Sequence, residues 1–251
     1  MNNLTIIIPV FNIDNKEKED LLRQAVKSCE GQTNIIAVGD KKSLKLLSEE
    51  KNIKCLENTS GDLSYAAQVD FAVSKVETEY FSVLEYDDAF TPIWFKEVEH
   101  YIKSTDEDLF GILPLTMLVD VKGEGFGFAN EAYWATSFSE EIGYLDLNSM
   151  LDYFNFNASG GIFKTAEFKA LGMLKPSMKL VFWFEFLLRA LYKGKKIYVI
   201  PKIGYRHMVG RKDSLSEHYE KEMTDKEGDW WIDLAKKEYY FPNDRNKKYE
   251  E

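Results

Sequence analysis

A short acidic turn, Glu85-Tyr86-Asp87-Asp88, holds the residues of this sequence most suited to chemistry. It follows the apolar run 80–84, and its three carboxylates would repel one another unless a cation lay among them. Carboxylate oxygens suit Mg²⁺ or Mn²⁺, and these ions keep coordination sites open for phosphate oxygens. The pattern predicts a divalent-cation site that takes a phosphate-bearing molecule. A solvated acidic turn that caps the next helix is the alternative interpretation.

The elements that must position this turn alternate regularly along the chain. β-Branched apolar runs predict buried strands, and segments with a helical apolar stripe separate them. The predicted strands are 4–10, 34–38, 53–56 and 80–84, and the predicted helices are 16–28, 43–50 and 64–76. This order predicts a parallel sheet with helices on both faces, and such sheets bind ligands beyond the carboxyl ends of their strands. Polar residues stand at three of these ends, namely Asn12 with Asp14, Asp40, and the acidic turn. Their convergence favours a binding site over a solvated turn.

The second half of the chain has a different pattern. We expect strands within 109–121 and 196–201, a turn entering a strand at 157–163, and a buried helix over 179–191. Glycine and aromatic residues between 123 and 139 predict a loop or lid, in which the aromatics of 126–134 could stack on a sugar or pack as satellite core. The charged segment from Glu217 predicts a helix that packs back on the body. The sequence contains no repeat or flexible linker, which favours one domain.

Composition narrows the classes of function. The 251 residues carry a net charge of −10 with a pI near 5.0, which argues against an electrostatic grip on nucleic acid or an anionic membrane. The two cysteines, Cys29 and Cys55, are too few for a disulfide framework. There is no signal-peptide pattern and no apolar run of membrane-spanning length, so we expect a cytoplasmic protein.

Several motifs resemble those of the family 2 glycosyltransferases, which have the GT-A fold. Thr5–Asn12 is similar to the family's opening "SIIIPVYN", and Ile35–Asp40 to its second strand, with Gly39 in place of an acid. Tyr80–Asp88 with Pro92-x-Trp94-Phe95 resembles the "DxD" strand end and the "PxWL" that follows it. Glu185–Gly194 resembles the family's "ExxLRxxxKG" helix. The resemblance covers about residues 3–100 and 157–215.

This resemblance implies an α/β fold with a GT-A-type, Rossmann-like mixed sheet flanked by helices on both faces. Residues 1–216 would form the glycosyltransferase domain, with a nucleotide-binding half, 1–100, and an acceptor-binding half, 101–216. Residues 217–251 would be a charged, aromatic helical extension. The implied reaction moves a sugar from a UDP-sugar donor to an acceptor hydroxyl with Mn²⁺ or Mg²⁺. The acceptor could be a glycan, a lipid carrier, a protein or a modified DNA base.

The resemblance also implies roles for individual residues. Pro9, Phe11, Asn12 and Asp40 would hold the nucleoside, while Glu85 and Asp87 would contact the ribose and the metal.

A second group would complete the donor site. Asp87, Asp88 and His207 are the predicted metal ligands, although a lone histidine is more often a surface residue. His207 lies in a basic loop whose Arg206 and Arg211 could clamp the diphosphate. The loop 157–161 resembles the acceptor-side loop of the family, and a plain tight turn is the alternative.

The expected catalytic base is missing from its usual motif. Where the family has "EDxE", this chain has Phe182-Trp183-Phe184-Glu185, so Trp183 stands at the position of the basic Asp. Glu185 could act as base instead, with a pKa raised by its apolar neighbours. Asp152 or Glu131 could serve, or the protein could be retaining or inactive. Glu185 could also be a buried acid paired with Arg189, one helical turn later.

Two other functions compete with the transfer of a sugar. A nucleotidyltransferase would need a glycine-rich basic loop after the first strand, and Phe11-Asn12-Ile13-Asp14 is not one. A non-catalytic GT-A-like protein that binds a nucleotide or a glycan would explain the missing base.

Overall fold

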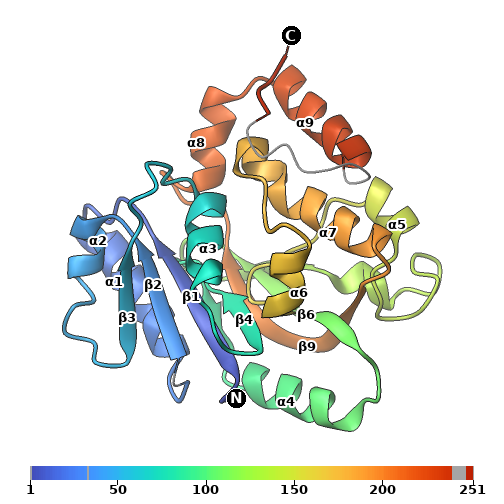
Figure 1. Ribbon diagram of the computed structural model, residues 1–251, viewed down its shortest axis with the longest axis horizontal. Helices are drawn as coiled ribbons and strands as arrows, with labels where there is room; N and C mark the ends of the chain where they lie inside the picture. The colour runs from blue at the N-terminus through green and yellow to red at the C-terminus, as the bar shows by residue number, and fades with distance from the viewer. Residues whose placement is uncertain (1, 33, 239–246, 251) are drawn as a thin grey trace.

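The computed structural model describes residues 2–32, 34–238 and 247–250. The strands of this part of the chain form one nine-stranded mixed sheet in the order β3-β2-β1-β4-β8-β6-β9-β5, with β7 paired to β6 (Figure 1). The strands are β1 Leu4–Val10, β2 Asn34–Gly39, β3 Ile53–Glu57, β4 Tyr80–Val83, β5 Ala89–Phe90, β6 Leu109–Val119, β7 Gly125–Ala129, β8 Ile162–Lys164 and β9 Lys196–Met208. The predicted mixed sheet is therefore confirmed.

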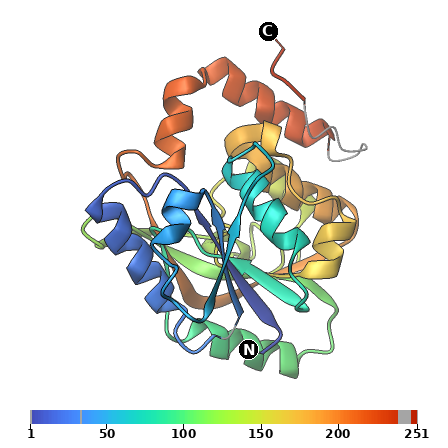
Figure 2. The same ribbon diagram turned by 60° about the vertical axis from the view of Figure 1, so that its left-hand side comes forward.

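Helices cover both faces of the sheet (Figures 1 and 2). The α-helices are α1 Lys16–Ser28, α2 Lys41–Lys45, α3 Tyr65–Ser74, α4 Trp94–Ser104, α5 Leu147–Asp152, α6 Thr165–Ala170, α7 Phe182–Tyr192, α8 Leu215–Glu222 and α9 Asp225–Glu238. The 3₁₀ helices are η1 Glu131–Trp134 and η2 Pro176–Val181. None of the helices described is long and apolar enough to cross a membrane.

The alternation of side chains along β1 divides the core into two layers. Ile7 packs with residues of α3 and α7, whereas Ile6 and Ile8 pack with residues of α1 and α4. Every residue of β1 is buried, as expected for a central parallel strand covered on both faces. Strands β3, β2, β1 and β4 run parallel, so their carboxyl ends meet at one edge of the sheet.

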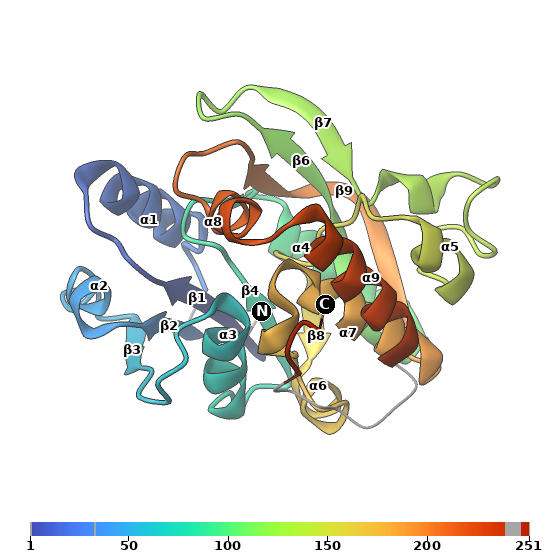
Figure 3. The same cartoon turned by 90° about the horizontal axis from the view of Figure 1, so that it is seen from above.

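The second half of the sheet is where the structure departs from the simplest prediction. Strand β8 lies antiparallel between β4 and β6, and β9 runs parallel to β6. Strand β9 is 13 residues long and ends at Met208, well beyond the predicted 196–201, so His207 lies on a strand rather than in a loop. The predicted lid over 123–139 contains β7 and η1, and β7 forms a hairpin with β6 that projects from the body (Figure 3).

The C-terminal segment packs back on the body, as expected. Helix α8 begins at Leu215, and α9 contacts both α7 and η2 (Figures 1 and 3). Trp231 of α9 is almost completely buried. Residues 239–246 and 251 of the predicted extension lie outside the described residues, and its division from the rest of the chain stays a prediction.

Candidate active site

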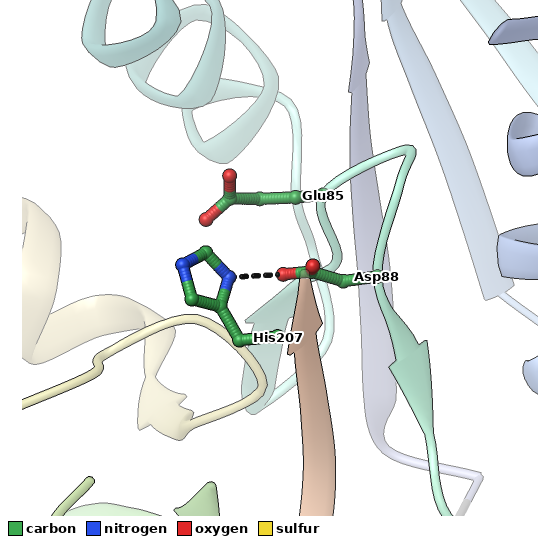
Figure 4. Close-up of side chains that lie close together, drawn as sticks. All are labelled: Glu85, Asp88 and His207. Carbon is green, nitrogen blue, oxygen red and sulfur yellow. Dashed lines mark hydrogen bonds and ion pairs between the residues drawn. The ribbon is translucent and has the colours of Figure 1, made fainter. Parts of the chain in front are cut away.

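Three side chains meet where β4 and β9 end. Glu85 and Asp88 follow β4, and His207 is the penultimate residue of β9 (Figure 4). Each offers one ligand atom, and these atoms lie within 4.8 Å of one another. Asp88 Oδ2 is 2.8 Å from His207 Nδ1, and Asp88 Oδ1 accepts a 2.8 Å hydrogen bond from the backbone N–H of Met208. We call Glu85, Asp88 and His207 the acidic triad.

Short strand β5 explains why residues so distant in the sequence come together. It begins directly after the acidic turn and pairs with β9, with Ala89 opposite Arg206. Asp88 is therefore held beside the end of β9 by the backbone itself. The Tyr205 hydroxyl accepts a 3.1 Å hydrogen bond from the backbone N–H of Glu85, which fixes the other end of the turn.

The environment of the triad raises the pKa values of Glu85 and His207. Burial raises the pKa of Glu85 to about 7, and the nearby Asp88 charge adds to this while His207 opposes it. Burial alone would lower the pKa of His207, but Asp88 and Glu85 raise it to about 10. Without a cation, the imidazolium of His207 therefore compensates the negative charge of the carboxylates at neutral pH.

Asp87 lies next to the acidic triad but is not part of it, and its role as a metal ligand stays a prediction. Its Oδ2 accepts a 2.8 Å hydrogen bond from Nε of Arg211, and both side chains are largely buried. Arg211 also donates to the Tyr86 hydroxyl, with its guanidinium 5.1 Å from the centre of the Tyr86 ring. Arg211 thus lies at the site, where Asp87 and Tyr86 engage it, and its contact with a diphosphate stays a prediction.

Arg206 is the basic residue that the structure does not bring to the triad. Adjacent residues on a strand point to opposite faces, so Arg206 faces away from the side on which His207 lies. Its side chain is exposed, and it forms no ion pair with any residue in the described ranges. The contact of Arg206 with the diphosphate therefore stays a prediction that this orientation does not favour.

The residues predicted to bind the nucleoside lie at the ends of β1 and β2. Pro9 is buried, Phe11 is exposed, and Asn12 adopts a left-handed backbone conformation with a φ of 54°. The backbone N–H of Asn12 donates to Asp40 Oδ2 at 3.3 Å. The structure thus brings Asn12 and Asp40 together.

Asp40 also caps helix α2. Its carboxylate accepts hydrogen bonds of 2.9 Å and 2.6 Å from the backbone N–H and the hydroxyl of Ser43. Burial by itself raises the pKa of Asp40, but these hydrogen bonds outweigh it and lower the pKa. Gly39 replaces the acid found in the family for a steric reason, since a Cβ there would lie 1.7 Å from the carbonyl oxygen of Val10.

A cavity of about 470 Å³ opens beside the triad. Glu85 and His207 line it together with the aromatic side chains of Phe154, Phe156, Trp183 and Phe184. Its other lining residues include apolar side chains and the loop Asn155–Ser159. The cavity is large enough for a sugar-sized ligand and joins the triad to the acceptor-side half of the chain.

The loop at 157–161 forms part of this wall. Asn130 Nδ2 donates to the carbonyl oxygens of Pro114 and Asn157, both at 2.9 Å, and Trp94 Nε1 donates to the carbonyl oxygen of Gly160 at 2.9 Å. Gly160 has a φ of +76°, and a Cβ there would lie 2.3 Å from the Tyr205 ring. The glycine is therefore required by packing as well as by backbone conformation.

Ser159 and Tyr65 are site residues to which sequence reasoning gave no role. The Ser159 hydroxyl donates a 2.6 Å hydrogen bond to Glu85 Oε1, and the Tyr65 hydroxyl lies 3.4 Å from Ser159 Oγ. Burial, with the Glu85 charge second, raises the pKa of Tyr65 well above its usual value. The loop 157–161 was a signal for Ser159, but nothing in the sequence around Tyr65 distinguishes it from a core residue.

Glu185 lies in a position that favours a structural role over the predicted role as a base. Its carboxylate is fully buried, accepts two 2.9 Å hydrogen bonds from Arg189, and lies 3.0 Å from Lys175 Nζ. It does not line the cavity, whereas its neighbours Trp183 and Phe184 do. The alternative interpretation, a buried acid paired with Arg189, is the one observed.

The other two candidate bases do not line the cavity either, although Glu131 Oε1 accepts a 3.4 Å hydrogen bond from Nδ2 of Asn155 in its wall. Asp152 and Glu131 are both exposed, and neither lines the cavity. Glu85 is the one carboxylate among the described residues that do line it.

Comparisons with known proteins agree with this geometry. The sequence profile described as Glycosyl transferase family 2 matches residues 5–131, half of the chain. A search of curated proteins finds no match.

Solved structures share the fold. The crystal structure of S. aureus TarS 1–349 aligns over 96% of this chain and 72% of its own length, with a TM-score of 0.61 and 15% identity. TarS 1–349 in complex with UDP-GlcNAc aligns over 94% and 71%, with a TM-score of 0.62 and 15% identity. The complex with UDP gives a TM-score of 0.61 at 16% identity, over 94% and 70%. At these identities the likeness establishes the fold.

Proposed function

Because this chain belongs to glycosyl transferase family 2, we propose that it transfers a sugar from a UDP-sugar donor to an acceptor hydroxyl, with a divalent cation at the acidic triad. The observation that carries this proposal is the convergence of Glu85, Asp88 and His207 beside a cavity, at the carboxyl edge of the parallel strands. That edge is where sheets of this kind bind their ligands.

A uridine nucleotide as donor is supported from two directions. The TarS structures that share the fold include complexes with UDP-GlcNAc and with UDP. In this chain, Phe11 is exposed at the end of β1, and the Asn12 backbone and Asp40 lie together at the end of β2. An aromatic face beside a hydrogen-bonding carboxylate suits a nucleobase.

The donor atoms of the triad fit Mn²⁺ or Mg²⁺. Glu85, Asp88 and His207 supply carboxylate oxygens and one imidazole nitrogen, a donor set that suits these ions. Burial and the Asp88 charge raise the pKa of Glu85, and a bound cation would favour its ionised form. When bound, such a cation would neutralise negative charge on the departing diphosphate. Asp88 is anchored by the Met208 N–H and Glu85 by the Ser159 hydroxyl, so both carboxylates are oriented before a ligand arrives.

The chain's own residues define the remaining roles. Asp87 is held by Arg211, which places a guanidinium beside the triad, where it can accompany a diphosphate. The cavity walls next to Glu85 and His207 consist mainly of aromatic and apolar side chains and the amides of Asn155 and Asn157. Trp183 occupies the position of the family's base, and this residue is the one observation that favours a second function, a non-catalytic nucleotide-binding relative.

Release of UDP from a panel of UDP-sugars in the presence of Mn²⁺ tests the proposal. We expect release from at least one donor, and we expect Asp88→Asn to abolish it. Glu107→Gln serves as the matched control, because Glu107 forms an exposed ion pair with Lys196 away from the triad. Binding of UDP without release or transfer from any donor would establish the non-catalytic function instead. Absence of UDP binding would refute both.

A further inference from the structure

Helix α9 packs against the body of the protein through buried side chains and an ion pair. Its Trp231 is 1% exposed, and the indole N–H donates a 3.1 Å hydrogen bond to Glu227 one turn earlier. Glu227 in turn forms an ion pair with Lys179 of η2. Ala235 is fully buried. These contacts fix α9 against the body along more than two of its turns.

The same contacts bring α9 to the cavity. Ile232 of α9 lines it, and so do Leu180 and Val181, the residues that directly follow Lys179. Lys236, one turn after Ile232, lies with its Nζ 5.2 Å from the centre of the Phe154 ring at the cavity wall. The cavity therefore extends from the triad to the C-terminal helix, which lies outside the residues matched by the family profile.

The chemistry of the cavity wall limits what can occupy it. Among the described lining residues none is Lys or Arg, and the charged groups are Glu85 and His207. A phosphate held against this wall, away from the triad, would lose hydration without gaining a Lys or Arg partner from the lining residues. The net charge of −10 makes approach of a polyanion still less favourable.

What the wall does offer is aromatic faces and amides. Phe154 and Phe156 pack around Phe184, with ring centroids 4.7 Å and 6.1 Å from it. Asn155 and Asn157 lie in the same stretch of wall. An aromatic surface accepts the C–H face of a pyranose ring, while amides bond its hydroxyls.

We propose that α9 forms a wall of the acceptor subsite, and that Ile232 and Phe154 select an uncharged saccharide as the acceptor. This inference rests on the proposed transfer reaction, and it assigns the acceptor class of the same site. The acceptor ring lies against Phe154 and Ile232, with its reacting hydroxyl toward the triad. Lys236 lies at the α9 end of this wall, with its Nζ 5.2 Å from the centre of the Phe154 ring.

An acceptor panel tests this proposal with the full-length protein, Mn²⁺ and the best UDP-sugar. The neutral probes are methyl glycosides of glucose, galactose and N-acetylglucosamine. The charged probes are ribitol phosphate, a methyl glucuronide and duplex DNA that carries hydroxymethylcytosine. We expect measurable transfer to a neutral glycoside and less than about a tenth of that rate to any charged probe.

Single substitutions then test whether Phe154 and Ile232 contact the acceptor. Phe154→Ala and Ile232→Ala should each raise the KM for the neutral acceptor roughly three- to tenfold. Phe154 is 46% exposed, so its truncation leaves the core intact. Asp233→Ala, on the exposed side of the same helix, is the matched control and should leave the acceptor KM unchanged.

Two results would overturn the inference. One is a preference for a charged acceptor that is lost in Lys236→Ala, which would make α9 an anion-binding wall. The other is an unchanged acceptor KM in both Phe154→Ala and Ile232→Ala. Either result leaves the proposed function standing if UDP is still released. Failure of the wild-type protein to release UDP from any donor is a failure of the proposed function itself.

Discussion

At the scale of single residues, the carboxylate of Glu185 is bound by two cations inside the core. Lys175, Glu185 and Arg189 are all nearly inaccessible to solvent, and Arg189 also donates to the carbonyl oxygens of Leu171 and Met173. This network ties the segment before η2 to helix α7. A buried pair of this kind penalises removal of one partner, because the charges that remain are left uncompensated.

Glu185→Gln should therefore cost stability rather than chemistry. We expect the free energy of unfolding to fall by about 3–5 kcal/mol, measured by urea denaturation. Glu107→Gln, which breaks an exposed ion pair with Lys196, should cost no more than about 1 kcal/mol. Unchanged stability in Glu185→Gln together with loss of UDP release would restore Glu185 as a base.

His207 and Arg206 offer a test with two adjacent residues on one strand. His207→Ala removes a ligand of the proposed cation, and we expect Mn²⁺ affinity to fall by at least about 100-fold. Arg206→Ala, on the opposite face of β9, should bind Mn²⁺ like the wild type. Calorimetric titration measures both. Equal affinity in all three proteins would remove His207 from the metal site.

The acidic turn was predictable at this scale because its signal is local. An apolar strand followed by clustered carboxylates is visible in a few adjacent residues. The partners of those carboxylates were harder to predict. Asp87 pairs with Arg211, 124 positions later, and Glu185 pairs with Lys175, from a stretch without regular periodicity. The sequence around a buried charge does not show which distant residue pairs with it.

At the scale of elements, the alternating half of the sheet was predictable and the mixed half was not. Strands β1 to β4 are apolar runs separated by amphipathic helices, so their type and order follow from periodicity. Strand β8 is only three residues long, and it is inserted antiparallel between β4 and β6. Its place is decided by pairing partners, which no single-strand pattern specifies.

The docking of α9 should depend on pH through Glu227. The hydrogen bond from Lys179 lowers the pKa of Glu227 below its usual value, so its ionised form favours the folded state. This contribution is complete above the unfolded-state pKa and is lost as the pH falls through the lower, folded-state pKa. We expect Glu227→Gln to have a lower free energy of unfolding than the wild type at pH 7, measured by urea denaturation. This difference should become smaller toward pH 3.

A control on the same helix separates this effect from general acid destabilisation. Asp233→Asn changes an exposed carboxylate of α9 and should show no gap that varies with pH. A gap between Glu227→Gln and the wild type that is equal at both pH values would mean that the Glu227 charge does not hold the helix.

At the scale of the whole molecule, ligand binding should couple to stability through the cation. UDP at 100 times its Kd stabilises a protein by about 2.7 kcal/mol. For a chain of this size that corresponds to a rise in Tm of roughly 5–10 °C. We expect this rise with Mn²⁺ present and a much smaller one in EDTA, measured by thermal unfolding. An equal rise in EDTA would show that UDP binds without the metal.

The long strand β9 restricts where related chains can gain or lose residues. It pairs with β6 from Lys196 to Met208 and delivers His207 at its far end. The register is irregular between Pro114 and Thr116 but regular from Tyr205 to Met208, so inserting or deleting one residue in that last stretch would turn Arg206 or Met208 inward and His207 outward. Related chains should therefore accept changes of size in the β6–β7 turn, around 120–124, and in the segment after 208, but conserve the number of residues from Tyr205 to Met208.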